Sequence, residues 1–181
     1  MKRIISLGFL LLFLLLVAAC AAKGPFTEER RGNVVTYARP ETGNAVTVTL
    51  SDRLKYDKRV RRDFMGANIE GHLYRAEDHT SVLVSNMVRK EFENLIGQEL
   101  ETTAVGIKAY PPHTSWLPGL CRLVRAYVVS VDCGVVVAVK FGPLYEGECD
   151  GTISEEAYMA DHLDEVAEFD RRAEEDISIS W

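Results

Sequence analysis

The chain has 181 residues, with 21 Lys or Arg against 27 Asp or Glu, and its formal net charge is −6 at pH 7. An acidic chain is a poor candidate for binding nucleic acid, because such binding depends on cations that neutralise phosphates. The length is sufficient for one domain with its own hydrophobic core and requires no second domain.

The N-terminus has the three parts of a secretory signal peptide. Residues 1–3 (MKR) are basic, residues 4–17 form an apolar run, and Ala18 and Ala19 precede Cys20. A charged start, an apolar stretch and small residues before the cleavage site are typical of such peptides. We therefore expect the chain to be exported.

The cysteine adds a second signal. Residues 17–20 (Val-Ala-Ala-Cys) resemble the lipobox of bacterial lipoproteins, in which the cysteine is alkylated with diacylglycerol before cleavage. The resemblance implies that Cys20 becomes a mature N-terminus carrying acyl chains such as palmitate. Burial of an acyl chain in the membrane contributes about 0.8 kcal/mol of binding free energy per methylene, and two or more chains give a stable anchor. Because Ala21 rather than aspartate follows, the resemblance favours the outer membrane, facing the periplasm, with the inner membrane as the alternative.

An uncleaved transmembrane helix is the other interpretation, since the apolar stretch 4–22 approaches the roughly 20 residues that span a bilayer. We favour residues 1–19 as a lipoprotein signal peptide, 20–32 as a lipidated tether and 33–181 as a single periplasm-facing domain. Cleavage would remove two basic residues and no acidic ones, which leaves a net charge of −8.

The first part of the domain reads as extended structure. Residues 34–37 and 45–50 are rich in β-branched side chains and are separated by turn-forming residues at 40–44. This pattern predicts two strands. Residues 51–79 are polar and give no clear assignment.

Two segments show helical periodicity. Between residues 80 and 97, apolar side chains recur at spacings of three and four, and Gly97 is placed to end a helix. A last helix is predicted from Ser154, with an apolar stripe that continues to Ile177 and acidic residues around the rest. Both helices are expected to pack on a sheet.

The region between these helices is predicted to be extended around a stiff, proline-rich loop at 111–119. The expected strands are 103–110, 122–131, 135–141 and 144–149. Short connectors make the last three an antiparallel meander. The predicted fold class is α+β: a mainly antiparallel sheet with two amphipathic helices packed on one face.

The order of elements over residues 45–177, including the phrase GPLYEGECDG (142–151), loosely resembles YajG-type outer-membrane lipoproteins and lipoprotein subunits of envelope transporters. These families have no catalytic residues to transfer. The resemblance implies a non-catalytic accessory role and assigns no residue beyond Cys20.

A basic run is the most prominent candidate contact surface. It contains Arg53, Lys55, Lys58, Arg59, Arg61 and Arg62. The run could bind anionic groups such as phospholipid heads, lipopolysaccharide phosphates or an acidic partner. The favoured alternative is a solvated loop or edge strand, where lysines block unwanted sheet pairing and interleaved aspartates dilute the charge.

The proline-rich loop carries His113 and Trp116, which could contact a ligand or pack under the sheet. Ser115 lacks the G-x-S-x-G context of a hydrolase nucleophile, and no two histidines have the i, i+4 spacing of a helical zinc site. The acidic C-terminal helix also lacks a calcium-loop pattern. We therefore expect no metal, no cofactor other than the covalent lipid, and no enzymatic activity.

Three cysteines follow Cys20 in the chain, at positions 121, 133 and 149. The envelope permits disulfides, and an odd number leaves one thiol over. Buried free cysteines and one bridge are equally compatible with the sequence.

These observations give three classes of function. The leading hypothesis is a membrane-anchored accessory lipoprotein that binds an envelope protein partner. The second is a lipid- or glycan-binding module that uses Tyr37, Tyr110, Trp116 and the basic run. The third and least favoured is a small hydrolase, for which His113 is the candidate residue.

Overall fold

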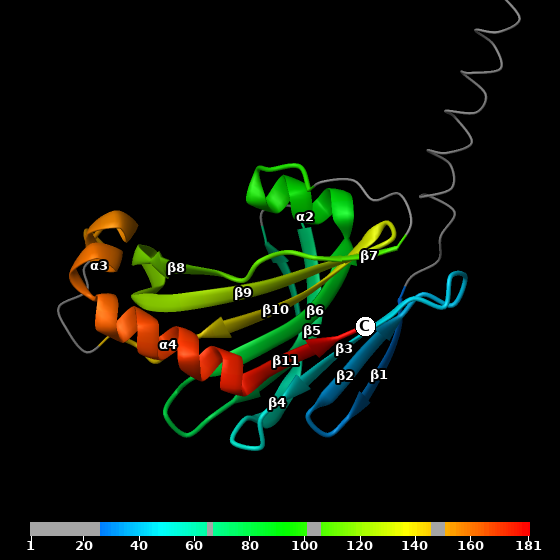
Figure 1. Cartoon of the computed structure of the whole chain (residues 1–181), viewed down its shortest axis with the longest axis horizontal. Coiled ribbons are helices and arrows are strands. Elements are labelled where there is room, and N and C mark those ends of the chain that lie inside the picture. The colour runs from blue at the N-terminus through cyan, green and yellow to red at the C-terminus, as the bar shows by residue number, and fades with distance from the viewer. Residues whose placement is uncertain (1–25, 65–66, 101–105, 146–150) are drawn as a thin grey trace, which may run out of the picture.

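The computed structural model describes residues 26–64, 67–100, 106–145 and 151–181. Within them the chain forms two antiparallel sheets and three helices (Figure 1), which confirms the predicted α+β class. The predicted signal peptide and Cys20 lie outside the described residues. Among the helices that are described, none is long and apolar enough to cross a membrane.

The smaller sheet has the order β1 (Thr27–Arg31), β2 (Val34–Ala38), β3 (Ala45–Leu50) and β11 (Ile177–Ser180). The larger sheet has the order β4 (Lys55–Phe64), β5 (Ala67–Arg75), β6 (Ser81–Val88), β10 (Gly134–Phe141), β9 (Arg122–Val131) and β7 (Ile107–Ala109). Strand β8 (His113–Leu117) also pairs with β9, and a 3-10 turn (Pro118–Leu120) follows it. The helices are α2 (Arg89–Ile96), α3 (Glu155–Asp161) and α4 (Leu163–Asp176).

The main hydrophobic core lies between the two sheets. Strict alternation in β3 turns Val46 and Val48 inward, and both are fully buried. From the larger sheet, Val82, Val84 and Val136 join the same cluster. Face-to-face packing of half-apolar strands therefore gives this domain its stability.

The helices cover opposite faces of the larger sheet. Lys140 and Arg125, neighbours across β10 and β9, turn toward α4 and form ion pairs with its residues. Val135 and Val137 alternate to the other face and pack against Phe92 of α2. The prediction that both helices share one face therefore does not describe the arrangement, because the smaller sheet occupies most of the inner face.

The segment predicted as one helix from 80 to 97 is divided. Its first half is β6, which pairs with β5 on one side and β10 on the other, and only Arg89–Ile96 is helical. Val84 and Met87 have the spacing of a helical stripe, whereas Val82 and Val84 have the two-residue spacing of a strand, and pairing with two strands decides between them. Gly97 does end the helix, with a left-handed backbone at φ 67°.

Four further segments were not predicted as the structure has them. Residues 27–31 of the predicted tether form β1, which pairs along the whole of β2. The unassigned segment 51–79 contains the long β4–β5 hairpin, and the proline-rich loop contains β8. The strand predicted at 144–149 is not formed in its described part; β10 pairs with β6 instead.

Cys121 and Cys133 are both disulfide-bonded. They flank the ten residues of β9, which extend about 33 Å, far beyond the roughly 7 Å between Cα atoms that a disulfide allows. They are therefore not bonded to each other. Of the two alternatives that the sequence left open, free thiols therefore do not describe Cys121 and Cys133, each of which is bonded to another cysteine.

Candidate functional site

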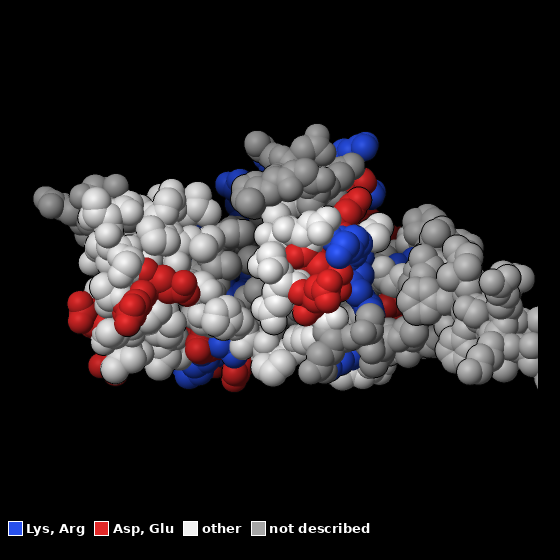
Figure 2. Space-filling model, turned by 90° about the horizontal axis from the view of Figure 1, so that it is seen from above, with Lys and Arg blue, Asp and Glu red and all other residues white. Residues whose placement is uncertain are grey.

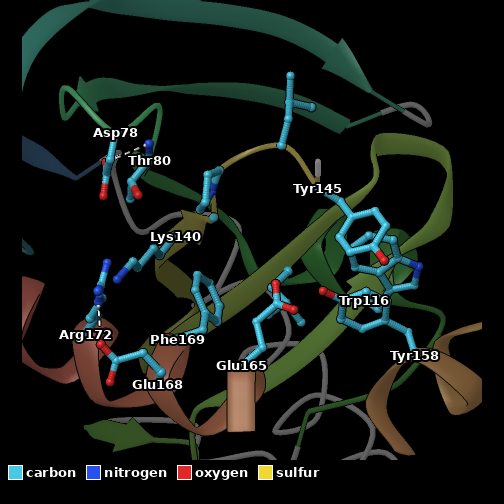
Figure 3. A pocket seen from close by; sticks show the side chains of 14 residues that line it. Asp78, Thr80, Trp116, Lys140, Tyr145, Tyr158, Glu165, Glu168, Phe169 and Arg172 are labelled. Atoms are coloured by element: carbon cyan, nitrogen blue, oxygen red, sulfur yellow. Dashed lines mark hydrogen bonds and ion pairs between the residues drawn. The ribbon is translucent and has the colours of Figure 1, made fainter. Parts of the chain in front are cut away.

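The principal cavity, of about 420 Å³, lies where α3 and α4 meet the end of the larger sheet (Figure 3). Its walls come from β8, β9, β10, the residues after β10, the two helices and the β5–β6 turn. Lys140, Glu168 and Arg172 lie at one end, and Trp116, Tyr145 and Tyr158 lie at the other. The site thus combines parts of the chain that are far apart in sequence.

The aromatic end is built from stacked rings. Trp116 of β8 and Tyr158 of α3 stack with centroids 3.7 Å apart and planes inclined by 3°. His162 covers the tyrosine at 4.1 Å, and Tyr145 meets the stack edge-on, 5.8 Å from Trp116. Because these four rings pack on one another, they form a preformed wall rather than a set of separate side chains.

This wall contains two buried polar groups. Among the described residues, Trp116 Nε1 has no hydrogen-bond partner. The Tyr158 hydroxyl lies beside the Glu165 carboxylate (Figure 3), and burial together with this interaction raises the pKa of Tyr158. Glu165 forms no ion pair among the described residues, so the tyrosine hydroxyl is its contact in the site.

The opposite end is charged but compensated. Lys140 Nζ lies 2.8 Å from Asp176 Oδ2, which also accepts from Arg53 at 2.5 Å and lies beside Ser51, whose Oγ donates to Oδ1 at 2.7 Å. Burial alone would raise the pKa of Asp176, but the bonds from Arg53 and Lys140 lower it to about 2. Burial lowers the pKa of Lys140, against the effect of its aspartate.

The remaining charges at this end are also paired. Glu168 accepts hydrogen bonds from Arg171 and Arg172, which lower its pKa to about 2. Arg53 forms a second ion pair with Asp78, on the β5–β6 turn. Each cation near the cavity thus has a carboxylate partner, and the charges largely cancel.

The basic run does not form one anion-binding surface. Arg53 belongs to the Asp176 pair, Lys55 donates to a backbone carbonyl, and Arg59 pairs with Glu70 at 2.8 Å. Lys58 and Arg61 are exposed; the register places Lys58 opposite Leu73 and Arg61 opposite Glu70, on the two faces of β4. The backbone of Arg62 lies in β4, but its side chain is outside the described part.

These residues instead lie at or before an edge strand, because β4 is at one end of the larger sheet. This is the arrangement of the favoured alternative, in which cations discourage further pairing. The face shown in Figure 2 carries small mixed groups of acidic and basic side chains without a continuous basic field.

The two loop residues are separated by the structure. His113 and Trp116 both lie in β8, but their spacing of three places them on opposite faces of the strand. His113 is exposed, whereas Trp116 is 1 % exposed and lines the cavity. Of the two alternatives given for this loop, Trp116 follows the packed one, because β8 formation turns the indole inward onto Tyr158.

The other aromatic candidates are elsewhere. Tyr37 is buried in the main core, where its hydroxyl donates to the Val84 carbonyl, and burial raises its pKa. Tyr110 lines a separate hollow of about 240 Å³ near Trp181. Within the described ranges, no group of three or more His, Cys, Asp or Glu is placed to hold a metal ion.

Sequence reasoning missed most of the cavity. Lys140, Tyr145, Tyr158 and Glu165 come from separate segments, and none belongs to a motif. Comparison with known proteins adds no assignment, because no family model, no curated protein and no solved structure matches this chain. The candidate site therefore rests on geometry alone.

Proposed function

We propose that this chain is a lipid-anchored lipoprotein of a bacterial envelope, with a non-catalytic accessory or partner-binding role on the periplasmic side of the outer membrane. The observation that carries the proposal is the sequence Val-Ala-Ala-Cys ending at Cys20, directly after a basic start and an apolar run. The position of the folded domain supports it. The described part of the chain begins at Phe26, six positions after Cys20.

Intact-mass spectrometry of the membrane-extracted protein tests the anchor. We expect a chain that begins at Cys20 and carries acyl mass. Cys20→Ala should abolish acylation and metabolic labelling with a palmitate analogue, whereas Ala22→Ser, outside the resembling segment, should retain both. A native chain that begins at Met1 without added lipid would overturn the proposal.

The disulfides supply a second test of the same residue. A thioether-linked lipid and a disulfide use the same sulfur atom, so Cys20 cannot carry both. Cys20 and Cys149 are the two other cysteines of the chain, so Cys121 and Cys133 can both be bridged intramolecularly only if Cys20 is one of the partners. Lipidation of Cys20 would leave one of the two without an intramolecular bridge. If the anchor is present, peptide mapping without reduction should find Cys20 acylated and one of Cys121 and Cys133 as a thiol or joined to another chain. A bridge that contains Cys20 would contradict the anchor.

The accessory role is tested by cross-linking in cells. We expect the mature chain to capture a defined envelope protein, and we expect Cys20→Ala to lose that capture because the domain leaves the membrane surface. Recovery of no envelope protein from cross-linked cells would count against a partner-binding role.

A second candidate function is a ligand-binding envelope module, and one observation favours it. The cavity of about 420 Å³ falls within the range of small-molecule sites and has aromatic walls with a few polar groups. This candidate would be supported if a small ligand bound saturably to the purified mature chain and changed the indole resonance of Trp116. Binding that leaves the Trp116 signal unchanged would exclude this cavity as its site.

A further inference from the structure

We propose that the cavity between α3, α4 and the end of β10 binds a sugar ring, as part of a glycan. This inference rests on the second candidate function, because it names the ligand class of that same cavity. It requires a site that is large enough, that offers both hydrogen-bond donors and acceptors, and that has an apolar surface for the ring.

The charges of the site favour a neutral, hydroxylated ligand. Lys140, Arg53 and Arg172 are paired with Asp176, Asp78 and Glu168, respectively. An anionic ligand would have to displace these carboxylates, and a strongly cationic one would have to displace the bases. A hydroxyl group needs neither exchange, because it donates to one partner and accepts from another.

The polar groups at the aromatic end match that chemistry. Glu165 has no ion pair among the described residues and interacts with the Tyr158 hydroxyl, so the carboxylate keeps lone pairs that can accept from ligand hydroxyls. A hydroxyl and a carboxylate thus lie side by side at the aromatic end (Figure 3).

The remaining surface suits the apolar face of a sugar ring. Phe169, only 7 % exposed, lies between the two ends of the cavity (Figure 3). Gly142 also lines the cavity. A Cβ atom at this glycine would lie 3.2 Å from the phenylalanine ring. Apolar floors with a few polar groups are typical of ligand sites.

The direction of the cavity argues for a glycan rather than a lipid surface. Phe26, the first described residue, packs at the Gly134 end of β10, whereas Lys140 and Gly142 of the cavity lie at the opposite end. Eight residues of strand separate the ends by about 26 Å. The six steps from Cys20 to Phe26 span at most about 22 Å. An anchor at Cys20 therefore keeps the Phe26 end within that distance of the membrane and leaves the cavity end of β10 free to lie away from it.

The test is a titration of the purified mature chain with soluble disaccharides, namely chitobiose, maltose and lactose, followed by the indole N–H resonances of the two tryptophans. We expect at least one sugar to shift the Trp116 resonance saturably and to leave the Trp181 resonance unchanged. The Trp181→Phe variant, which has one indole resonance, shows which of the two belongs to Trp116. Glu165→Gln should weaken that binding by about tenfold, because it loses a charge-assisted hydrogen bond. Asp164→Asn, the exposed neighbour on α4, should bind as the parent does.

Three results would overturn the inference. They are no shift at Trp116 with any of the sugars, equal weakening by the Glu165 and Asp164 substitutions, or the same Trp116 shift produced by phospholipid vesicles in place of sugar. Failure of the anchor is distinguishable, because a chain without acyl groups that binds sugar at Trp116 would leave this inference standing.

Discussion

Lys140 Nζ and Asp176 Oδ2 lie 2.8 Å apart, and the two residues are 1 % and 2 % exposed. Their ion pair joins β10 of the larger sheet to the junction of α4 and β11. Asp176 is also hydrogen-bonded to Ser51, just after β3, and to Arg53 before β4. One carboxylate thus connects both sheets and the helical wall of the cavity.

Asp176→Asn should lower the free energy of unfolding by about 3 kcal/mol, because removing one partner of a buried pair leaves Lys140 charged without compensation. Urea unfolding measures this change. Glu175→Gln is the matched control, since this neighbour is exposed and pairs only with Arg171 at the surface; its cost should be below about 1 kcal/mol. Equal costs for the two variants would contradict the role assigned to Asp176.

Lys140→Met should cost less than Asp176→Asn. The methionine fills much of the lysine volume, and Asp176 retains Arg53 and Ser51 as partners. An apolar replacement of one buried charge is tolerated when the other charge stays paired. Unfolding in urea should therefore rank Lys140→Met between the parent and Asp176→Asn; the reverse order would show that Lys140 is the essential member.

Acid should destabilise the fold through the same carboxylate. The pKa of Asp176 is about 2 in the folded chain against a usual 3.8. Between these values the unfolded chain holds the proton and the folded chain does not, so stability falls as the pH drops from about 4 to about 2. The loss should be about 2 kcal/mol at full protonation. When the free energy of unfolding is measured at several pH values in this interval, it should fall less steeply for Asp176→Asn than for the parent. Equal slopes for the two proteins would refute the assignment.

Asp132 fastens the β2–β3 turn to the β9–β10 turn. Its buried carboxylate accepts from Thr42 Oγ1 at 2.8 Å and from the Gly106 amide at 2.9 Å, and its own backbone has φ 51°. Asp132→Ala should cost about 3 kcal/mol, because it leaves these donors unsatisfied and places alanine in a left-handed conformation. Thr42→Val should cost about 1 kcal/mol. Thermal unfolding of the two variants measures these losses of stability. Similar losses for Asp132→Ala and Thr42→Val would mean that Asp132 does not hold the two turns together.

Gly71 of β5 should not tolerate a side chain. A Cβ atom there would lie 2.4 Å from the Val84 carbonyl oxygen and 2.8 Å from Ser85 Cβ, so the strands would have to separate. Gly71→Ala should therefore destabilise the domain by about 2 kcal/mol. Gly119→Ala, where no atom lies within 4 Å, is the control and should be nearly neutral. A stable Gly71→Ala protein would show that β5 and β6 are less closely packed.

The strands with clear alternation could be predicted from sequence. Val46 and Val48 indicated β3, and the short Asp132–Gly134 connector indicated the β9–β10 hairpin. Strand β6 could not be recognised, because Val84 and Met87 continue the helical spacing of the residues that follow, and only pairing with strands on both sides excludes a helix there. Strand β4 was hidden by its charged side chains, which face solvent at a sheet edge.

The cavity could not be predicted for a different reason. Trp116, Tyr145 and Tyr158 belong to three separate segments, and nothing in their spacing indicates that their rings meet. Trp116 was singled out for its loop, but β8 pairing sets its direction. The role of Lys140 could not be predicted, because its ion-pair partner, Asp176, lies 36 positions away and no sequence pattern connects the two residues.

Helix α4 ends at Asp176 and β11 begins at Ile177, so no loop separates them. Any swing of the helix would twist a strand that is hydrogen-bonded along β3. The helical side of the cavity is consequently rigid. The facing side is held as well, because the Tyr145 amide donates to the Cys121 carbonyl at 3.0 Å and the Tyr145 ring packs on Trp116. A guest would then have to match a shape that exists before it enters, and selection among guests would be by fit.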